Sequence, residues 1–296
     1  MDIPQQYLAE IRKLAPDLII RQIELNTDGL VNDVVVINRQ RIFRFPKHEW
    51  AKKAMQHEAR VLDLARKFVN LRLPRFDLQR DDVASYEFIP GQALLRDDIL
   101  RLDRNAQDAL AETLAGFLSQ LHSIPQASLD EADIQPSDAV RTAEDWLQLY
   151  EAVQQKLYPL LMSDAREWVE RLFTPLAEDH KMMKYTPVLI HGDLGPYHIL
   201  CERRSGHIQG IIDFGTAGRG DRAADFACLI NAYGETFLRR IGKYYPATRE
   251  HIERARFWAG TLELQWLLGG VRSGDLSWFT VHIGRARDVQ PLGSGW

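Results

Sequence analysis

Two aspartates stand directly after short apolar runs, and they are the residues of this chain best suited to chemistry. Asp193 comes shortly after the run Val188–Ile190, and Asp213 comes directly after the run Ile208–Ile212. Functional side chains often lie where a rigid strand meets a loop. The two carboxylates, 20 residues apart, are therefore candidates for one shared site.

The segment between the two aspartates predicts how they meet. Glu202–His207 is typical of a hairpin turn, and a hairpin would bring both strand ends back together. Asp193, Asp213 and His198 would then face one cavity. This arrangement suits phosphoryl transfer, because Mg²⁺ prefers carboxylate oxygens and water and a second carboxylate can orient an acceptor hydroxyl and receive its proton.

The elements that precede these motifs predict a small antiparallel sheet with two helices. β-branched runs, separated by turn residues such as Asn26–Gly29, are typical of a meander with short connections. The expected order is a helix at residues 4–15, strands at Ile19–Leu25, Val31–Ile37 and Ile42–Phe45, a helix at Glu49–Phe68, and strands at Arg75–Leu78 and Ala84–Ile89.

Pro90–Gly91 is the strongest break in the chain, and the pattern after it is mostly helical. We therefore place a domain boundary there, between residues 1–90 and 91–296. Apolar residues at helical spacing mark the later helices, as in the stripe of Leu110, Leu114, Phe117, Leu118 and Leu121.

The bulk composition indicates a globular protein and argues against several classes. Of 296 residues, 45% are hydrophobic and 26% are charged, and the net charge is -4, whereas nucleic-acid binders usually carry a basic excess. No apolar run approaches the ~20 residues of a membrane span, and no secretory signal is visible. Cys201 and Cys228 are expected to be reduced thiols. We expect a cytoplasmic protein without a membrane or nucleic-acid partner.

The two aspartate motifs, in this order and at this spacing, resemble the signature of the aminoglycoside phosphotransferase family, which is related to the protein kinases. The motifs are His191–Leu200 and Ile211–Gly215. Earlier in the chain, Asn32–Val34 and Ile42–Lys47 resemble the 2''-aminoglycoside phosphotransferases in particular. The resemblance extends from about Leu25 to Trp266.

This resemblance implies an α+β, protein-kinase-like fold with two lobes. Residues 1–90 would form the nucleotide-binding lobe with its small antiparallel sheet, and residues 91–296 a helical lobe with the catalytic and substrate sites. The implied activity is the transfer of the γ-phosphate of ATP or GTP to a hydroxyl of a small molecule. An aminoglycoside antibiotic is the leading acceptor, and a macrolide or a metabolite such as a sugar or amino alcohol is the alternative. A monomer or weak dimer is expected.

The resemblance also implies roles for three residues of the motifs. Asp193 would be the catalytic base or would orient the hydroxyl, and Asp213 would bind Mg²⁺. His198 holds the position of the second Mg²⁺ ligand, where asparagine is commoner. Neutral imidazole is a poorer Mg²⁺ ligand than a carbonyl oxygen. The sequence therefore leaves open whether one or two Mg²⁺ ions bind.

The nucleotide-binding residues are expected in the first lobe. Arg44 occupies the place of the kinase lysine that holds the phosphates, with Glu58 as its helix partner and Lys47 as another phosphate contact. Arginine keeps the charge but is not interchangeable with lysine. Thr27 and Gly29 lie where kinases have a glycine-rich loop. The residues of the interlobe hinge, whose backbone groups would bind the base, are Tyr86, Glu87, Phe88 and Ile89.

The acceptor site is expected in the helical lobe. A polycationic acceptor needs carboxylates, and the candidates are Asp221, Glu235, Glu263 and Asp275. Trp266 is a further candidate, although its helical spacing from Trp258 fits core packing equally well.

Two other readings account for part of the pattern. A metal hydrolase could use His191, Asp193 and His198, because the spacing H-x-D-x4-H offers metal ligands. That reading leaves Asp213 and the N-terminal meander unexplained. A catalytically dead nucleotide-binding scaffold is the other, and the presence of both aspartates argues against it.

Overall fold

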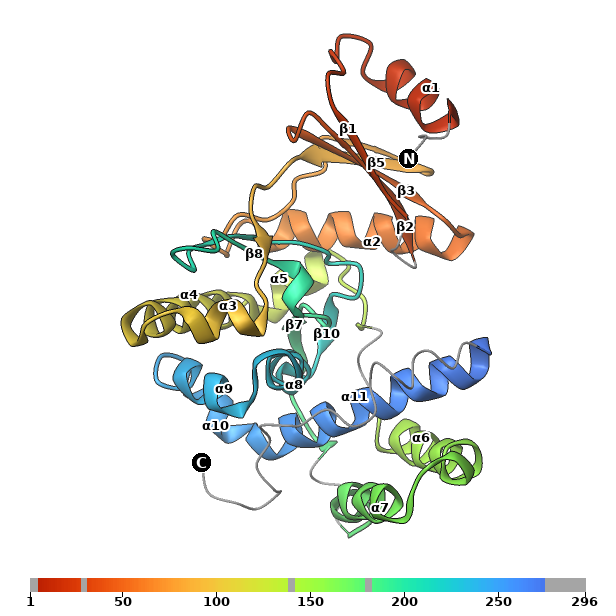
Figure 1. Cartoon of the computed structure of the whole chain (residues 1–296), viewed down its shortest axis with the longest axis vertical. Coiled ribbons are helices and arrows are strands. Elements are labelled where there is room, and N and C mark those ends of the chain that lie inside the picture. The colour runs from red at the N-terminus through yellow and green to blue at the C-terminus, as the bar shows by residue number, and fades with distance from the viewer. Residues whose placement is uncertain (1–4, 28–30, 138–141, 179–182, 275–296) are drawn as a thin grey trace.

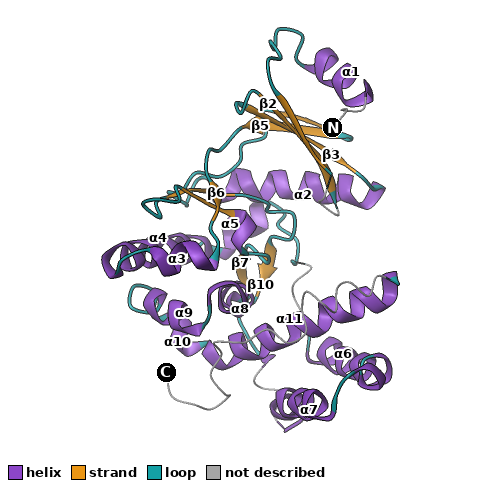
Figure 2. Ribbon diagram, viewed as in Figure 1, coloured by secondary structure: helices purple, strands orange, loops and turns teal. Residues whose placement is uncertain are grey.

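The protein has a small part built on a sheet and a larger helical part (Figure 1). The computed structural model describes residues 5–27, 31–137, 142–178 and 183–274. Strands are concentrated above helix α2, and helices make up most of the remainder (Figure 2). None of the helices in these ranges is long and apolar enough to cross a membrane.

The first part contains an antiparallel sheet of five strands in the order β1-β2-β3-β5-β4. Its strands are β1 (Ile23–Asn26), β2 (Asn32–Ile37), β3 (Arg41–Pro46), β4 (Leu78–Arg80) and β5 (Val83–Glu87).

Strand alternation gives the sheet two different faces. Val35, Ile37, Phe43 and Phe45 form one face and pack with Ile11 of helix α1 (Gln5–Leu14) in a separate small core. The intervening residues form the other face. Cross-strand pairing places Val34 opposite Arg44 and Ile42 opposite Tyr86. The alternation therefore turns the Arg44 side chain away from α1.

Helix α2 (Glu49–Ala65) joins the sheet to the helical part. Its Val61, Leu62, Leu64 and Ala65 belong to the large core of the helical part. Glu58, in the middle of the helix, is buried. The apolar residues of α2 thus pack the helix against the second part, while Glu58 can pair with a side chain of β3.

The helical part is built around one large core. The predicted stripe of leucines in α4 is buried in it, and Trp146 of α6 meets the Phe257 ring of α11 edge to face at 5.0 Å. The helices are α3 (Arg96–Arg101), α4 (Arg104–His122), α5 (Gln126–Glu131), α6 (Ala143–Lys156), α7 (Ser163–Glu178), α8 (Arg222–Tyr233), α9 (Glu235–Ile241), α10 (Ala247–Glu250) and α11 (Ile252–Ser273). Short 3₁₀ helices lie at Tyr158–Leu160 and Pro196–His198.

Two small sheets carry the polar motifs. One contains β6 (Gln92–Ala93), β8 (Ile199–Cys201) and β9 (Ile208–Ile211), and the other pairs β7 (Val188–Ile190) with β10 (Gly218–Gly220). Directly after Pro90–Gly91, β6 pairs with β8 and not with the five-stranded sheet. On this pairing we propose the lobe boundary at Pro90–Gly91.

Some predicted element bounds were wrong for a reason that the pairing explains. The first strand begins at Ile23 instead of Ile19, because its partner β2 ends opposite it at Ile37. The preceding residues bond instead to the Asn38 side chain, which accepts from the N–H groups of Arg21 and Gln22.

Two other bounds also shifted. The strand expected at Arg75–Leu78 starts only at Leu78, where it pairs with Ser85. The helix expected to reach Phe68 ends at Ala65 and continues as a turn.

Candidate active site

The β8–β9 hairpin positions both aspartate motifs. Ile199 pairs with Ile211, and the N–H of Ile212 donates to the carbonyl of His198 at 2.9 Å. The turn predicted at Glu202–His207 is present, since Gly206 N–H donates to the Glu202 carbonyl. The hairpin therefore sets the residue before β8 beside the residue before Asp213.

The apolar run before Asp193, β7, pairs with a different strand from the run after Asp193, β8. Ile190 of β7 pairs with Gly218 of β10, so the chain returns after Asp213 to lie beside β7. Two loops, 191–198 and 212–217, are thereby held side by side.

His198 lies between the two aspartates. Its Nδ1 is 3.7 Å from Asp193 Oδ2, and its Nε2 is 3.5 Å from Asp213 Oδ2. The side chains of Asp193 and Asp213 are 56% and 49% exposed. The structure thus brings the predicted base and the two predicted Mg²⁺ ligands together, with both carboxylates open to a ligand.

The hydrogen bonds of His198 assign its tautomer. Nδ1 lies 2.6 Å from the backbone carbonyl of Asp193, and a carbonyl can only accept, so the proton is on Nδ1. Its Nε2 faces Asp213 Oδ2 at 3.5 Å. When deprotonated, this nitrogen could serve as a metal ligand together with the Asp213 carboxylate.

His191 braces the catalytic loop and has no nitrogen left for a metal. Its Nδ1 accepts from the Asp193 N–H at 3.2 Å, and its Nε2 donates to the Ile212 carbonyl at 3.0 Å. Burial lowers the pKa of His191, which favours this neutral form. In the described ranges no group of three or more His, Cys, Asp or Glu side chains is arranged to hold a metal. With both ring nitrogens hydrogen-bonded, His191 does not serve as the metal ligand that the hydrolase reading assigns to it.

Asp225 of α8 holds the start of the same loop. Its carboxylate accepts from the N–H groups of His191 at 3.0 Å and Gly192 at 2.8 Å, and from His122 Nε2 at 3.0 Å. Burial opposes this charge, but the interactions with His122, His191 and the Gly192 N–H together outweigh it and lower the pKa of Asp225. Sequence reasoning missed His122, because it lies at the end of the apolar stripe of α4 and carries no motif.

Gly192 is required by its backbone. Its φ is +82°, and a Cβ there would lie 2.8 Å from the carbonyl oxygen of Thr216. Other residues rarely adopt this conformation. The tight turn lets the two loops approach each other.

Arg44 and Glu58 form a buried ion pair that reaches Asp213. Arg44 Nη1 donates to Glu58 Oε1 at 2.7 Å, and Arg44 Nη2 lies 3.8 Å from Asp213 Oδ1. Glu58 Oε1 also accepts from the Phe214 N–H at 3.2 Å. The pair thus links β3, α2 and the segment after β9.

Burial and charge act against each other in this group. Burial opposes the charge of Arg44, but Glu58 and Asp213 outweigh it and raise the Arg44 pKa. Burial raises the pKa of Glu58, and Arg44 counters that shift in part. Burial likewise opposes the charge of Asp213, yet Arg44 and then His198 hold its pKa below the usual range. The Asp213 side chain is therefore held in its ionised form.

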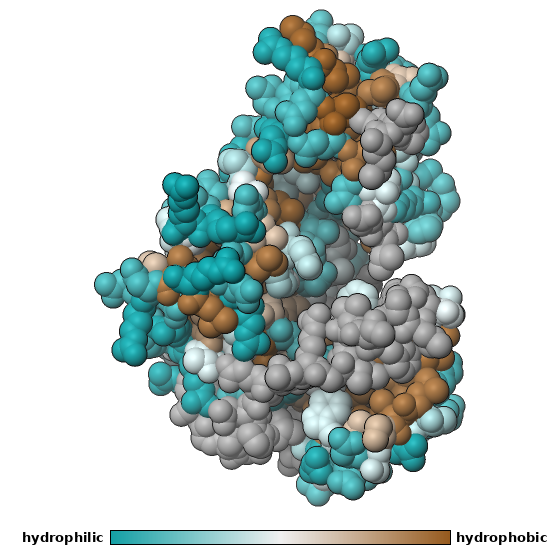
Figure 3. Space-filling view, in the orientation of Figure 1, coloured by the Kyte–Doolittle hydropathy of each residue, from teal (hydrophilic) through white to brown (hydrophobic). Residues whose placement is uncertain are grey.

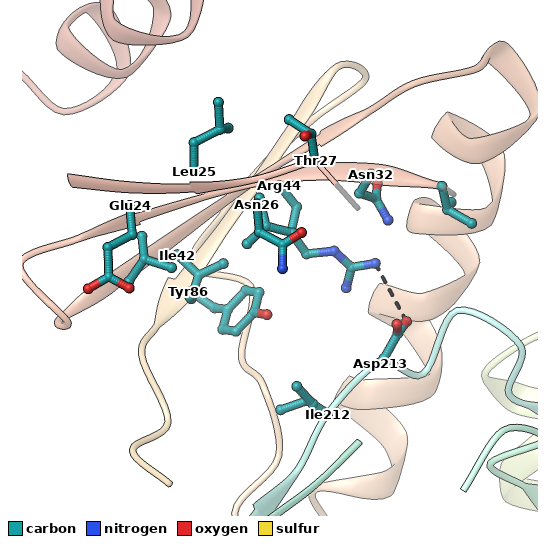
Figure 4. A pocket seen from close by; sticks show the side chains of 13 residues that line it. Glu24, Leu25, Asn26, Thr27, Asn32, Ile42, Arg44, Tyr86, Ile212 and Asp213 are labelled. Carbon is teal, nitrogen blue, oxygen red and sulfur yellow. Dashed lines mark ion pairs between the residues drawn. The ribbon is translucent and has the colours of Figure 1, made fainter. Parts of the chain in front are cut away.

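A cavity of about 600 Å³ opens beside this group (Figure 4). In Figure 4 the Arg44 guanidinium points at Asp213 across the cavity, with Tyr86 and Ile212 nearby. The cavity is lined by Glu24, Leu25, Asn26, Thr27, Val31, Asn32, Val34, Val36, Ile42, Arg44, Tyr86, Ile212 and Asp213.

Some of the other predicted nucleotide contacts line this cavity and others do not. Thr27 and Tyr86 line it, and Gly29 lies outside the described residues. Burial raises the pKa of Tyr86 to about 12, so its hydroxyl is neutral. Lys47 bonds to the Thr27 carbonyl at 2.7 Å and lies 3.2 Å from Asp33, and thus ties down the start of the β1–β2 connection.

One backbone group of the expected hinge is already used. The Phe88 N–H donates to the Gln40 carbonyl at 2.8 Å. Of the four hinge residues, Tyr86 lines the cavity, and the binding of a base by the other backbone groups stays a prediction.

Two predicted acceptor contacts are also corrected. Asp221 is buried and paired with Arg254 through two hydrogen bonds. Asp221 follows Gly220 of β10, which pairs with Val188 at the start of β7. Asp193, in contrast, lies beyond Ile190 at the end of β7. Glu235 is buried and paired with Arg256. Both charges are neutralised inside the lobe, so neither can attract an acceptor.

Of the remaining acceptor candidates, Glu263 and Trp266 lie on α11, and Asp275 lies outside the described residues. Glu263 is partly buried, and Trp266 is 43% exposed.

Comparisons with known proteins agree with this geometry. The profile of the phosphotransferase enzyme family matches residues 22–258. Viomycin phosphotransferase from Streptomyces vinaceus is 34% identical over 193 residues, which are 63% of this chain and 63% of that protein. The match thus spans less than two thirds of this relative.

Solved structures agree over nearly the whole chain. The GDP and kanamycin complex of the aminoglycoside phosphotransferase APH(2'')-IIIa has a TM-score of 0.84 and 28% identity, over 95% of this chain and 96% of that one. A macrolide 2'-phosphotransferase type I has a TM-score of 0.73 at 19% identity, over 97% and 100%, and at that identity it supports the fold alone. These likenesses confirm the predicted α+β, protein-kinase-like fold. The chain belongs to the phosphotransferase enzyme family.

Proposed function

We propose that the protein transfers the γ-phosphate of ATP or GTP to a hydroxyl of a small molecule, with an aminoglycoside as the leading acceptor. The observation that carries this proposal is the placement of His198 between Asp193 and Asp213, where Asp213 lines a cavity that Arg44 also lines. Such a reaction would take place in the cytoplasm, where these nucleotides are abundant.

The nucleotide occupies the cavity under the sheet. Its base lies between Ile42, Tyr86 and Ile212, and the Glu87 carbonyl and Ile89 N–H bind its edge. Its phosphates extend toward Arg44, whose guanidinium is held by Glu58. An arginine in this place gives a planar fork that suits phosphate oxygens.

Asp213 and His198 Nε2 fit a Mg²⁺ ion, since Asp213 lines the cavity, is held ionised, and lies 3.5 Å from His198 Nε2. A kinase Mg²⁺ site needs only one or two protein ligands besides phosphates and water. Bound there, Mg²⁺ would neutralise charge on the phosphates.

Asp193 orients the acceptor hydroxyl and receives its proton. The acceptor oxygen forms a bond to the γ-phosphorus while the bond from that phosphorus to the bridging oxygen breaks, and ADP or GDP leaves. The rigid support of the Asp193 loop by His191 and Asp225 keeps the carboxylate in place.

Two acceptors are favoured by specific observations. The kanamycin-bound relative, similar over 95% of the chain, favours an aminoglycoside. The 34% identical viomycin phosphotransferase favours viomycin as a second candidate.

The test is a nucleotide-consumption assay with ATP and GTP against kanamycin, viomycin and a macrolide. The proposal expects acceptor-dependent formation of ADP or GDP and a phosphorylated product by mass spectrometry. The matched control is Asp193→Asn, which should show neither. If no hydroxyl acceptor stimulates nucleotide consumption and the mass of each acceptor stays unchanged, the proposed activity is refuted.

A further inference from the structure

A second cavity, of about 990 Å³, lies beside the connection between the two parts of the chain. It shares no lining residue with the cavity proposed for the nucleotide. Its wall comes from both parts: Arg39 belongs to the turn between β2 and β3, and Arg203 and Arg204 belong to the turn between β8 and β9. Figure 1 shows the β8–β9 hairpin reaching out below the sheet on this side.

Two of the three arginines of this cavity, Arg203 and Arg39, have carboxylate partners. Arg203 Nε lies 3.1 Å from Asp98 Oδ1, and Asp98 is buried, where it also accepts from the Leu95 N–H at the start of α3. Because this pair uses Nε, both terminal nitrogens of the Arg203 guanidinium remain for another partner. The fork geometry of arginine suits phosphate and carboxylate groups.

Arg39 has a partner on the sheet in an exposed ion pair. Its Nε lies 3.5 Å from Glu24 Oε1. The turn that carries it is fixed by Asn38, whose side-chain oxygen accepts from two backbone N–H groups at 2.8 and 2.9 Å. The backbone of Arg39 is therefore fixed relative to the sheet.

The lining of the cavity contains three arginines and one carboxylate, Glu202, which accepts a hydrogen bond from Ser205. The carboxylates paired with Arg39 and Arg203, those of Glu24 and Asp98, do not line the cavity. Gln92 and Gln209 add side-chain amides. Such a lining offers many donors to an anion and little repulsion.

We propose that this cavity binds a small anion with two or more phosphate or carboxylate groups, at a site separate from catalysis. An anion held by Arg39 and by Arg203 or Arg204 would join the five-stranded sheet to the hairpin that carries His198 and Asp213. Its binding would therefore restrain the two parts against each other.

The binding is tested by calorimetry with inorganic tripolyphosphate and, separately, citrate, in Mg²⁺-free buffer. The wild-type protein should bind one equivalent outside the nucleotide cavity. Arg203→Gln/Arg204→Gln should weaken this binding at least about tenfold, since hydrogen bonds to charged groups are lost. Arg39→Gln should weaken it too, and it provides a second variant from the other part if the double variant folds poorly. The two probes separate phosphate from carboxylate recognition.

Two controls place the site. Arg171→Gln removes the same charge from an exposed pair on α7 and should leave the affinity unchanged. Arg44→Gln alters the proposed nucleotide cavity and should also leave it unchanged. Equal affinities of the wild type, Arg39→Gln and the double variant would overturn the proposal. So would binding that is lost only in Arg44→Gln, because the anion would then occupy the nucleotide cavity.

Thermal unfolding gives an independent reading. A ligand that binds only the folded state stabilises it, so tripolyphosphate should raise the unfolding midpoint of the wild type and of Arg44→Gln. The midpoint of the double variant should not move. An equal rise in all three proteins would contradict a site at Arg203 and Arg204.

Discussion

Asp193 has a side chain open to ligands on a loop whose backbone is held at several points. Its N–H bonds to His191, and its carbonyl bonds to His198 and to the Gly195 N–H. The backbone is thus fixed while the carboxylate is 56% exposed. This division suits a group that must meet a substrate in one orientation.

Asp193→Asn should therefore keep the fold and nucleotide binding but lower turnover. An amide cannot receive the hydroxyl proton, and removal of a general base costs at least about 100-fold in kcat. Steady-state kinetics with the acceptor found in the screen, and calorimetry with the nucleotide, measure the two effects. Turnover within a few-fold of the wild type would show that the base is elsewhere.

Asp213 should make nucleotide binding depend on Mg²⁺. Asp213→Ala removes a carboxylate that is kept ionised by Arg44 and His198 and that fits the metal. The nucleotide affinity of the wild type should rise with Mg²⁺, and the affinity of the variant should not. Calorimetry with and without Mg²⁺ measures this, and the same Mg²⁺ effect in both proteins would refute the assignment.

At the scale of elements, the Arg44–Glu58 pair connects β3 to α2 and to the chain after Asp213. Glu58 binds both Arg44 and the Phe214 N–H, so the position of α2 and the position of Asp213 are set together. Truncation of one partner leaves the other charge buried and unpaired, which is costly.

Arg44→Gln and Glu58→Gln should therefore not be additive. Each single variant should lose kcat/KM, and the double variant should lose less than the sum, with a coupling of about 1–3 kcal/mol. A double-mutant cycle on kcat/KM and on the free energy of unfolding measures it. Additive losses would mean that the two charges act separately.

Asp225 joins α8 and α4 to the catalytic loop, and this contact predicts a pH dependence of stability. The folded pKa of Asp225 is lowered by His122, His191 and the Gly192 N–H together against the effect of burial, whereas an unfolded Asp titrates near about 3.9. The unfolded state then binds the proton more readily, so this contribution is full above about pH 4 and is lost as the pH falls toward the folded pKa.

Asp225→Asn should accordingly flatten the acid limb of stability. Urea unfolding between pH 3 and pH 7 should show a smaller fall for the variant than for the wild type. Parallel curves would mean that the carboxylate is not linked to folding in this way. Asp130→Asn, a variant at an exposed ion pair, is the matched control.

At the scale of the whole molecule, the sequence allowed much of the fold and the centre of the site to be predicted. The motif spacing around Asp193, His198 and Asp213 sufficed, because a short hairpin leaves few ways to join two adjacent strand ends. Strand alternation likewise fixed the face of Arg44. These are local constraints, readable from neighbouring residues.

The parts that failed depend on distant partners. Asp221 and Glu235 looked like acceptor carboxylates until Arg254 and Arg256, from α11, were found paired with them. The backbone groups of Tyr86, Glu87, Phe88 and Ile89 were expected to bind a nucleotide base, but the Phe88 N–H donates to the Gln40 carbonyl. No local pattern reveals which distant side chain or strand will neutralise a polar group.

The choice of acceptor is also a property of the whole molecule. Of the four carboxylates expected to attract a cationic acceptor, Asp221 and Glu235 are paired inside the lobe, Asp275 lies outside the described residues, and Glu263 of α11 is partly buried. Attraction between exposed charges weakens as salt screens it. We therefore expect kanamycin affinity to fall between low and high ionic strength, and Glu263→Gln to reduce both the affinity and its salt dependence.

The matched control is Glu167→Gln on the exposed face of α7, which removes an equal charge and should leave kanamycin affinity unchanged. Calorimetry with kanamycin at several salt concentrations, in parallel with nucleotide titrations, separates the two sites. Glu263→Gln should weaken kanamycin more than nucleotide, because Glu263 does not line the nucleotide cavity. If neither salt nor Glu263→Gln changes kanamycin affinity, recognition is not driven by this carboxylate, and an acceptor such as a macrolide, bound by apolar contacts, becomes the better reading while the roles of Asp193 and Asp213 stand.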